Sequence, residues 1–383
     1  MSLVFYPGGD IMKRLALIIL LLSLFLSACA PAPVDTAEEN RDSDNRFRYW
    51  PGRSFVETEN AYIGADGQFL HFWDKETGES GILCAKPECL HNGENCGAYY
   101  PGYTSSLGFY DGKLYWFQRM PPNCGLWRMD PDGTNREFFR PLDRSSLPPV
   151  GLETRFHRGK AWFLSASPEV IEGEPQTTLA LYTLALEGDE DFSPAFSRVY
   201  SGSLRDTSFF TCGDGAVIIL REAETDSCRV LRWTQGESDV TEVASLPLEG
   251  AVINASYVTV DGEIFVALNS PVDGGSLGVL WKAEDGQFRK VIEFRDGDTV
   301  YNYPFMGENI VIASAGGGQV RQLWVCDLEG RTLYKGPWEL PAGEGFREII
   351  PMGGQDNWFI YHISGSFIKY DFSPDGINET LLW

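Results

Sequence analysis

Three cysteines and a histidine lie close together in the sequence, between residues 84 and 96. They are Cys84, Cys89, His91 and Cys96, in the spacing Cys-x4-Cys-x-His-x4-Cys. Three thiolates and an imidazole can fill one tetrahedral zinc shell, although this spacing is not that of a standard zinc finger. Outside the cytoplasm, cysteines commonly form disulfides. The sequence therefore leaves three states open for these residues: disulfides, a bound metal such as zinc, and free thiols.

A further cysteine, Cys124, is expected to lie near this segment. Cys124 falls in a loop of the second of seven repeats described below, whereas residues 84–96 connect the first repeat to the second. A shared metal site is one possible outcome. Two disulfides among the four cysteines Cys84, Cys89, Cys96 and Cys124 are another.

The first cysteine of the chain, Cys29, follows the pattern of a secretory signal. Lys13 and Arg14 form a short positive segment, and residues 15–26 form an apolar run that is followed by small residues. Such a run is shorter than the ~20 residues of a membrane span. The sequence Leu-Ser-Ala-Cys at residues 26–29 resembles the lipobox of bacterial lipoproteins. The resemblance implies cleavage before Cys29, a diacylglycerol on its sulfur, and a protein held on the extracytoplasmic side of the cell membrane.

Composition divides the chain into three segments. Residues 1–28 are the expected signal peptide, with Met12 as its true start because an acidic residue and a turn precede the positive segment. Residues 29–49 have almost no apolar content, which predicts a flexible, lipidated tether. Residues 50–383 carry the apolar residues of a folded domain. The formal net charge of the chain is −23, which repels phosphate backbones, so we expect no nucleic-acid partner.

A strand pattern returns seven times after residue 50. The copies cover residues 70–74, 126–130, 181–185, 230–234, 279–283, 323–327 and 367–371. A second set of apolar runs follows pairs such as Asp111-Gly112 and Asp261-Gly262, which are hairpin signals. A repeat of 44–56 residues built only from strands predicts an all-β fold, a β-propeller of seven four-stranded blades. Adjacent apolar residues within the strands fit blades that are packed on both faces.

Three segments carry a resemblance to known propellers. Residues 112–116 (Gly-Lys-Leu-Tyr-Trp) and 124–133 (Cys-Gly-Leu-Trp-Arg-Met-Asp-Pro-Asp-Gly) resemble propellers of the TolB type and of the low-density-lipoprotein-receptor type. Residues 84–96 resemble a segment near the start of many lipoprotein propellers from Gram-positive anaerobes, a group without an established activity. The resemblance implies the fold and the location, and it implies no reaction.

Long loops are expected on one face of this propeller. Residues 165–179, 269–278 and 314–322 are predicted to be loops between the second and third strands of their blades, on the same face as residues 84–96. Loops on a rigid scaffold frequently bind ligands. This face is therefore the expected binding face.

The sequence assigns no residue a catalytic role. It contains no P-loop and no H-E-x-x-H, and catalytic residues stay unassigned. The remaining histidines, His71, His157 and His362, fall in or beside strands and are expected to be structural. We therefore expect a binding or scaffolding module for a peptide, glycan or protein partner. The alternative is an extracytoplasmic enzyme that cleaves polysaccharide or peptide, since abundant carboxylates could supply an acid–base pair.

Overall fold

The structure is a computed structural model. It describes residues 44, 47, 53–101, 104–119, 123–149, 151, 153–316, 320–340, 349–363 and 365–383. The expected signal peptide, with Cys29, lies outside these residues, as does the expected tether apart from Asp44 and Phe47. Within the described ranges, no helix is both long enough and apolar enough to cross a membrane.

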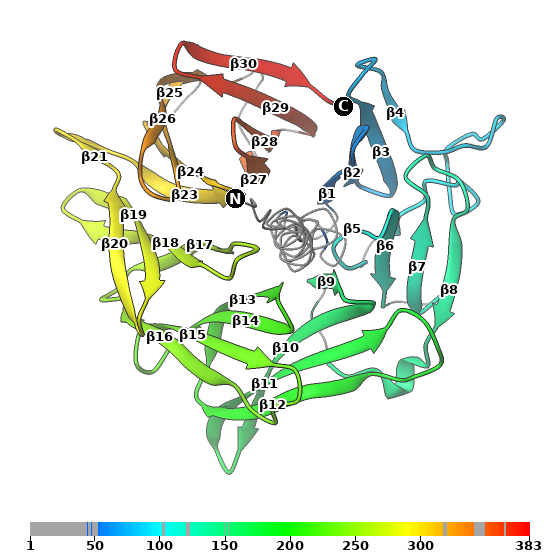
Figure 1. The fold of residues 1–383 in the computed structure, drawn as a ribbon, viewed down its shortest axis with the longest axis horizontal. Coiled ribbons are helices and arrows are strands. Elements are labelled where there is room, and N and C mark those ends of the chain that lie inside the picture. The colour runs from blue at the N-terminus through cyan, green and yellow to red at the C-terminus, as the bar shows by residue number, and fades with distance from the viewer. Residues whose placement is uncertain are drawn as a thin grey trace, which may run out of the picture. The chain divides into compact units, whose positions relative to one another are not determined.

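Seven four-stranded antiparallel sheets form the body, and each is built from four consecutive strands. Figure 1 shows them arranged around a centre, with the first strand of each sheet innermost and the last sheet beside the first. Blades 1 to 3 consist of β1 (Arg53–Glu57), β2 (Ala61–Asp66), β3 (Phe69–Asp74), β4 (Ser80–Ile82), β5 (Gly108–Tyr110), β6 (Lys113–Gln118), β7 (Gly125–Met129), β8 (Glu137–Pro141), β9 (Thr154–His157), β10 (Lys160–Ile171), β11 (Glu174–Ala185) and β12 (Ser193–Ser201). Blades 4 and 5 consist of β13 (Leu204–Cys212), β14 (Gly215–Glu222), β15 (Ser227–Thr234), β16 (Thr241–Pro247), β17 (Val252–Val258), β18 (Ile264–Val272), β19 (Gly275–Glu284) and β20 (Gln287–Glu293). Blades 6 and 7 consist of β23 (Asn302–Gly307), β24 (Ile310–Ala315), β25 (Val320–Asp327), β26 (Thr332–Glu339), β27 (Ile349–Gln355), β28 (Trp358–Ile363), β29 (Ser366–Ser373) and β30 (Gly376–Leu381).

This arrangement confirms the predicted β-propeller of seven four-stranded blades. The seven repeats found in the sequence lie in the third strands of the blades, from β3 to β29. Among the residues that the structure describes, two small elements lie outside the blades: a 3-10 turn at Arg144–Ser146 and a short hairpin of β21 (Arg295–Asp296) and β22 (Thr299–Val300) before blade 6.

The prediction of long loops in blades 3 and 5 is wrong, because both segments form β-hairpins. In blade 3, β10 and β11 stay paired until the two-residue turn Glu172-Gly173, where φ is 55° and 88°. In blade 5, β18 and β19 stay paired until the turn Asp273-Gly274. Residues that tolerate positive φ close such turns without splaying the strands. The strands therefore continue through polar segments that looked like loops in the sequence.

The hydrophobic core lies between the faces of neighbouring blades. The second strand of blade 4 illustrates this, because Val217, Ile218, Ile219 and Leu220 are all completely buried. Successive side chains of a strand point to opposite faces. Ile218 and Leu220 belong to a cluster with blade 3, whereas Val217 and Ile219 belong to a cluster with blade 5. Burial on both faces explains why the strands lack alternation of apolar and polar residues.

Aromatic packing closes the ring between blade 7 and blade 1. The ring of Phe55 in β1 stacks 6.3 Å from Phe367 in β29 and 6.4 Å from Trp383, which follows β30. The ring of Phe47 meets Phe55 edge-on at 5.1 Å. In the part of the chain that the structure describes, blades 1 and 7 each contain only their own consecutive strands. Closure is therefore carried by side-chain packing between two complete sheets.

Candidate functional site

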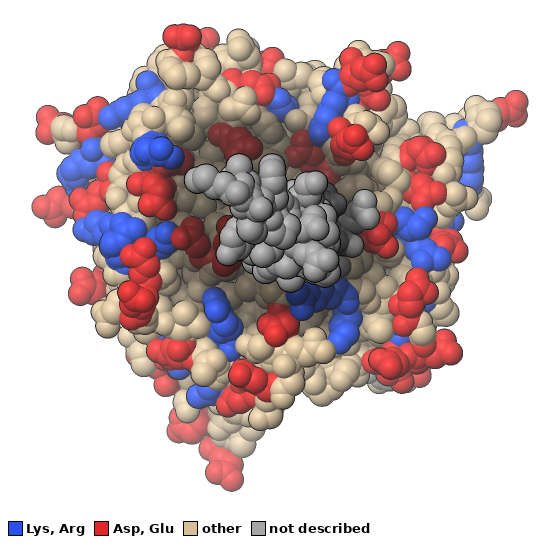
Figure 2. Space-filling view, in the orientation of Figure 1, with Lys and Arg blue, Asp and Glu red and all other residues tan. Residues whose placement is uncertain are grey.

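A cavity of about 290 Å³ lies among the inner strands of blades 3 to 6. Its walls come from residues just before and within β9 and from β13, β17 and β23, which are innermost strands on one side of the ring in Figure 1. Figure 2 shows that acidic and basic side chains are scattered over the face of the molecule that Figure 1 presents. We call this cavity the channel pocket.

β-bulges shape three walls of the channel pocket. The pairing of the first and second strands shifts register between Arg205 and Ser208 in blade 4, and again in the first strands of blades 5 and 6. The bulged residues include Asp206 and Tyr303, whose φ values are 48° and 49°. Bulges bend a strand and re-aim its side chains, and they are frequent near binding sites. Here they turn the ends of adjacent inner strands towards one cavity.

Hydrogen bonds join these inner strands to one another. The hydroxyls of Ser208 in β13 and Ser256 in β17 lie 2.7 Å apart. The side-chain amide of Asn254 in β17 donates to the carbonyl of Pro304 in β23 at 2.6 Å. Since each bond crosses from one blade to the next, these bonds link the pocket walls of blades 4, 5 and 6 to one another.

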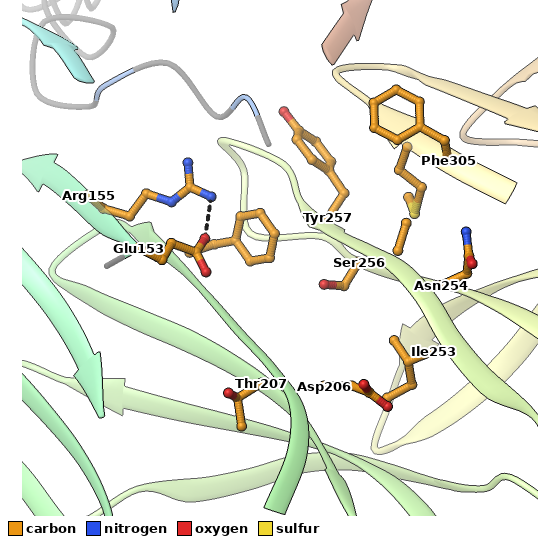
Figure 3. Close-up of a pocket in the computed structure, with 12 residues that line it drawn as sticks. Glu153, Arg155, Asp206, Thr207, Ile253, Asn254, Ser256, Tyr257 and Phe305 are labelled. Carbon is orange, nitrogen blue, oxygen red and sulfur yellow. Dashed lines mark hydrogen bonds and ion pairs between the residues drawn. The ribbon is translucent and has the colours of Figure 1, made fainter. Parts of the chain in front are cut away.

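One ion pair spans the blade 3 side of the channel pocket. Nη2 of Arg155 lies 2.8 Å from Oε1 of Glu153, and the side chains of Arg155 and Glu153 are 6% and 30% exposed. Figure 3 shows this pair facing Tyr257 and Ser256 across the pocket. The guanidinium carbon of Arg155 also lies 5.4 Å from the ring centre of Phe210, within cation–π range. Asp206 adds an exposed carboxylate at the bulge of β13.

The channel pocket combines apolar and polar chemistry. The partly exposed side chains of Ile253 and Ala255 give it apolar surface, and nearly buried aromatic rings lie behind them. Arg155, Asp206 and Ser256 supply donors and acceptors. The exposed wall of the pocket is mainly polar. A few oriented polar groups give a binding site its specificity, so the geometry suits binding of a polar molecule.

The second candidate site is the thiol cluster, by which we mean Cys84, Cys89, His91 and Cys96. The structure brings one potential ligand atom from each of these residues together, all within 4.8 Å of one another. Nδ1 of His91 lies 3.3 Å from Sγ of Cys96. The three cysteines are free thiols in the structure. Of these four residues, Cys96 is buried and the others are half-buried.

Backbone N–H groups point at two of the sulfurs. Sγ of Cys96 accepts a hydrogen bond from the N–H of Ala98 at 3.4 Å, and Sγ of Cys84 accepts from Lys86 and Gly97. Burial raises the pKa of the Cys84 thiol, but hydrogen bonds from these N–H groups and neighbouring thiols outweigh burial and lower it overall. Burial raises the pKa of the Cys96 thiol to about 11. The two thiols therefore differ in pKa, and the Cys84 thiol ionises more readily than the Cys96 thiol.

Cys124 does not lie with the thiol cluster. Its side chain packs against the hydrophobic cluster between blades 2 and 3, whereas the cysteines of the thiol cluster pack between blades 1 and 2. Burial raises the pKa of the Cys124 thiol, against the opposing effect of Arg144 and Arg119. Among the described residues, the group of potential metal ligands consists of the thiol cluster without Cys124.

The remaining histidines lie in or beside the strands where the sequence placed them. His157 ends β9, and its Nε2 lies 2.7 Å from the carbonyl oxygen of Gly213. His362 in β28 is completely buried, and its ring meets Phe367 at 5.0 Å. His71 in β3 stacks on Trp383 at 6.1 Å, and burial lowers the pKa of its imidazole. These contacts belong to blade packing.

Sequence reasoning missed the channel pocket. Its residues come from four blades, so no short motif contains them. A usable signal did exist: the first strand of each of blades 4 to 6 has polar residues in its starting half, ahead of an apolar pair. The clearest example is Arg205–Phe210 (Arg-Asp-Thr-Ser-Phe-Phe). Inner strands of a propeller meet at the centre, so such polar starts in successive blades indicate a lined channel.

Comparison with known proteins finds similarity of fold. No protein-family model matches the sequence, and no curated protein matches it. Solved structures that resemble it include a prolyl endopeptidase, with 13% identity, a TM-score of 0.48, and coverage of 93% of this chain and 53% of that chain. Acylaminoacyl peptidase of Pyrococcus horikoshii has 11% identity, a TM-score of 0.49, and coverage of 90% and 53%. TolB of Acinetobacter baumannii has 11% identity, a TM-score of 0.38, and coverage of 79% and 64%.

The matched proteins include peptidases as well as TolB, so they favour no single activity. This chain spans about half the length of the two peptidases. The class of protein that the topology defines is a seven-bladed β-propeller. Its function has to be argued from its own residues.

Proposed function

We propose that this chain is an extracytoplasmic lipoprotein that binds part of a peptide or glycan in its channel pocket. The observation that carries the binding role is the pocket itself, whose walls come from four blades and are joined by hydrogen bonds between them. A preformed pocket loses little conformational entropy when a ligand enters. The lipoprotein role follows from the signal pattern that ends at Cys29.

The chemistry of the pocket supports a ligand with hydroxyl, amide or amine groups and apolar faces. Glu153 already pairs with Arg155, which leaves the exposed carboxylate of Asp206 as the acceptor most open to a ligand. The half-buried side chain of Ile253 lies beside Asp206, as Figure 3 shows, and adds a small apolar surface. Both a sugar ring and a short peptide present polar groups beside apolar ones.

Replacing Asp206 with asparagine is expected to weaken ligand binding at least about tenfold. A hydrogen bond to a charged group contributes ~1.5–3 kcal/mol, and 1.4 kcal/mol corresponds to a factor of ten. Asparagine also tolerates positive φ, so the bulge should keep its shape. The measurement is titration of the purified full chain with ligands chosen from peptide and glycan arrays. Asp189→Asn, in an exposed turn of blade 3, is the matched control and should leave binding unchanged. Equal affinity of Asp206→Asn and the parent chain would argue against this pocket.

Cleavage of a polysaccharide or peptide is the second candidate function. The observation that favours it is the presence of two carboxylates, Glu153 and Asp206, in the same pocket. Mass spectrometry of the array ligands after incubation separates the two functions. Intact ligands support the binding module, whereas products that disappear with Glu153→Gln and Asp206→Asn support the enzyme.

Replacing Cys29 with alanine is expected to release the protein from the membrane or leave it unprocessed. A lipid chain is the proposed anchor, and alanine has no sulfur to carry it. The measurement is the distribution of the chain between membrane and soluble fractions, together with the mass of its first peptide. Cys212→Ala, in blade 4, serves as the control and should remain in the membrane fraction. Membrane retention of Cys29→Ala after normal signal cleavage would contradict the anchor.

A further inference from the structure

We infer that the thiol cluster binds one zinc ion in a closed, structural site, with all four of its residues as ligands. This inference is independent of the proposed ligand-binding function, because the cluster lies between blades 1 and 2 and shares no residue with the channel pocket. Three thiolates and one imidazole form one of the standard donor sets of structural zinc.

The spacing of the ligand atoms matches a tetrahedral shell. With zinc bonds of ~2.3 Å to sulfur and ~2.0–2.1 Å to nitrogen, a sulfur and a nitrogen ligand are about 3.6 Å apart, and two sulfurs are about 3.8 Å apart. The observed distance from Nδ1 of His91 to Sγ of Cys96 is 3.3 Å, and no pair in the cluster is separated by more than 4.8 Å. Side-chain adjustments of less than an ångström or so would therefore bring all four ligands onto one ion.

The backbone around the cluster is arranged to stabilise thiolates. The N–H of Ala98 donates to the sulfur of Cys96, two residues earlier, and the N–H of Lys86 donates in the same way to Cys84. Hydrogen bonds to a sulfur favour its charged form and orient it as a ligand. A Cβ at Gly97 would lie 3.2 Å from the Cys84 sulfur, so glycine permits this close approach.

The connector that carries the cluster is hydrogen-bonded to blade 1 at both ends, whereas most of its middle is solvent-exposed. At its ends, the N–H of Leu83 donates to Leu70, and the N–H of Leu70 donates to Ala98, both at 2.8 Å. Between them, residues 83–98 contain no strand, and Leu90 is 81% exposed. Ordering such a segment costs conformational entropy, which a metal bound from four positions offsets.

Arg136 supplies a positive charge beside the cluster. A zinc ion with three thiolates carries a net charge of −1. The guanidinium of Arg136 lies over the ring of Trp127 at 4.2 Å and is close enough to Cys96 to interact with its charge. Among the described residues, Arg136 forms no ion pair with a carboxylate. The loaded cluster is a suitable counter-charge for this half-buried guanidinium.

A disulfide would use only two of the four residues of the thiol cluster, whereas a zinc ion would use all four. Three cysteines can form at most one bridge among themselves, which would leave one thiol and His91 without a role. Cys124, which could complete a second bridge, packs between a different pair of blades. Zinc uses all four residues of the cluster, and it also protects the thiolates from oxidation in the extracytoplasmic location that we propose.

Elemental analysis of the full chain, purified without added reductant or chelator, tests this inference. We expect about one zinc ion per chain. Cys89→Ser and His91→Ala should lose zinc to a competing chelator that leaves the parent chain loaded. His91→Cys should keep the ion, because it restores a fourth ligand. Cys124→Ser is the matched control and should remain fully loaded.

Cobalt titration of the chelator-stripped parent chain keeps the test informative if a variant fails to fold. Uptake of one cobalt ion with the absorption of a tetrahedral thiolate complex supports the site. A metal-free chain whose mass is lower than that of the fully reduced chain, by two hydrogens for each disulfide, would overturn the inference in favour of disulfides. A metal-free chain with every thiol open to alkylation, or stoichiometric iron in place of zinc, would also overturn it.

Discussion

Replacing Phe359 with alanine is expected to lower the free energy of unfolding by about 3–5 kcal/mol. Phe359 in β28 is completely buried and lies between blades 6 and 7. Its ring stacks on Tyr370 at 5.1 Å and meets Trp338 of blade 6 at 6.2 Å. Removing it leaves a cavity that the surrounding rings cannot fill, since they belong to two different rigid sheets.

Denaturant unfolding followed by far-ultraviolet circular dichroism measures this effect. Leu381→Ala, in the outer strand of the same blade, is the control, because Leu381 is 61% exposed. Its effect should stay within about 0.5 kcal/mol. A loss of less than ~1 kcal/mol for Phe359→Ala would mean that this interface does not contribute as the packing indicates.

Replacing Phe55 with alanine is expected to destabilise the closure of the ring, again by about 3–5 kcal/mol. Phe55 is 1% exposed and lies among Phe367 and Trp383 of blade 7 and Phe47. Because the described parts of blades 1 and 7 share no strand, side-chain packing has to hold them together. Loss of the Phe55 side chain should therefore open the propeller first at the interface between blades 7 and 1, which we call the seam.

Hydrogen exchange distinguishes opening of the seam from general destabilisation. In Phe55→Ala, amides of β1 and β29 should exchange faster, while those of β14 in blade 4 should keep their protection. Val252→Ala, at a 46% exposed position of an inner strand, is the control and should leave all these amides unchanged. Equal acceleration in blades 1, 4 and 7 would contradict closure by this aromatic cluster.

The blade count could be predicted from the sequence because each blade repeats the same burial requirement. Runs such as the one from Val217 to Leu220 are apolar throughout, since each residue packs on one of two neighbouring blades. The hairpins of blades 3 and 5 could not be recognised in this way. Around Glu172 their strands project beyond the packed sheet and are solvent-exposed, so no hydrophobic pattern marks them as strands.

The two candidate sites differ in how far the sequence could reveal them. The residues of the thiol cluster are neighbours in the chain, so their spacing alone suggested a shared site. Cys124 was expected nearby because it follows in the next blade, but its loop directs the side chain to the opposite face of that blade. The channel pocket depends on bulges at Asp206 and in adjacent strands, and register shifts of this kind leave no mark on hydrophobic periodicity.

The most direct test of the proposed function is hydrogen exchange of the full chain with and without the ligand that binds most tightly on the peptide and glycan arrays. The account predicts that protection on ligand binding is concentrated in β9, β13, β17 and β23, whose residues line the channel pocket. Protection confined to the outer strands or to the β10–β11 hairpin, with no change in those four inner strands, would contradict it.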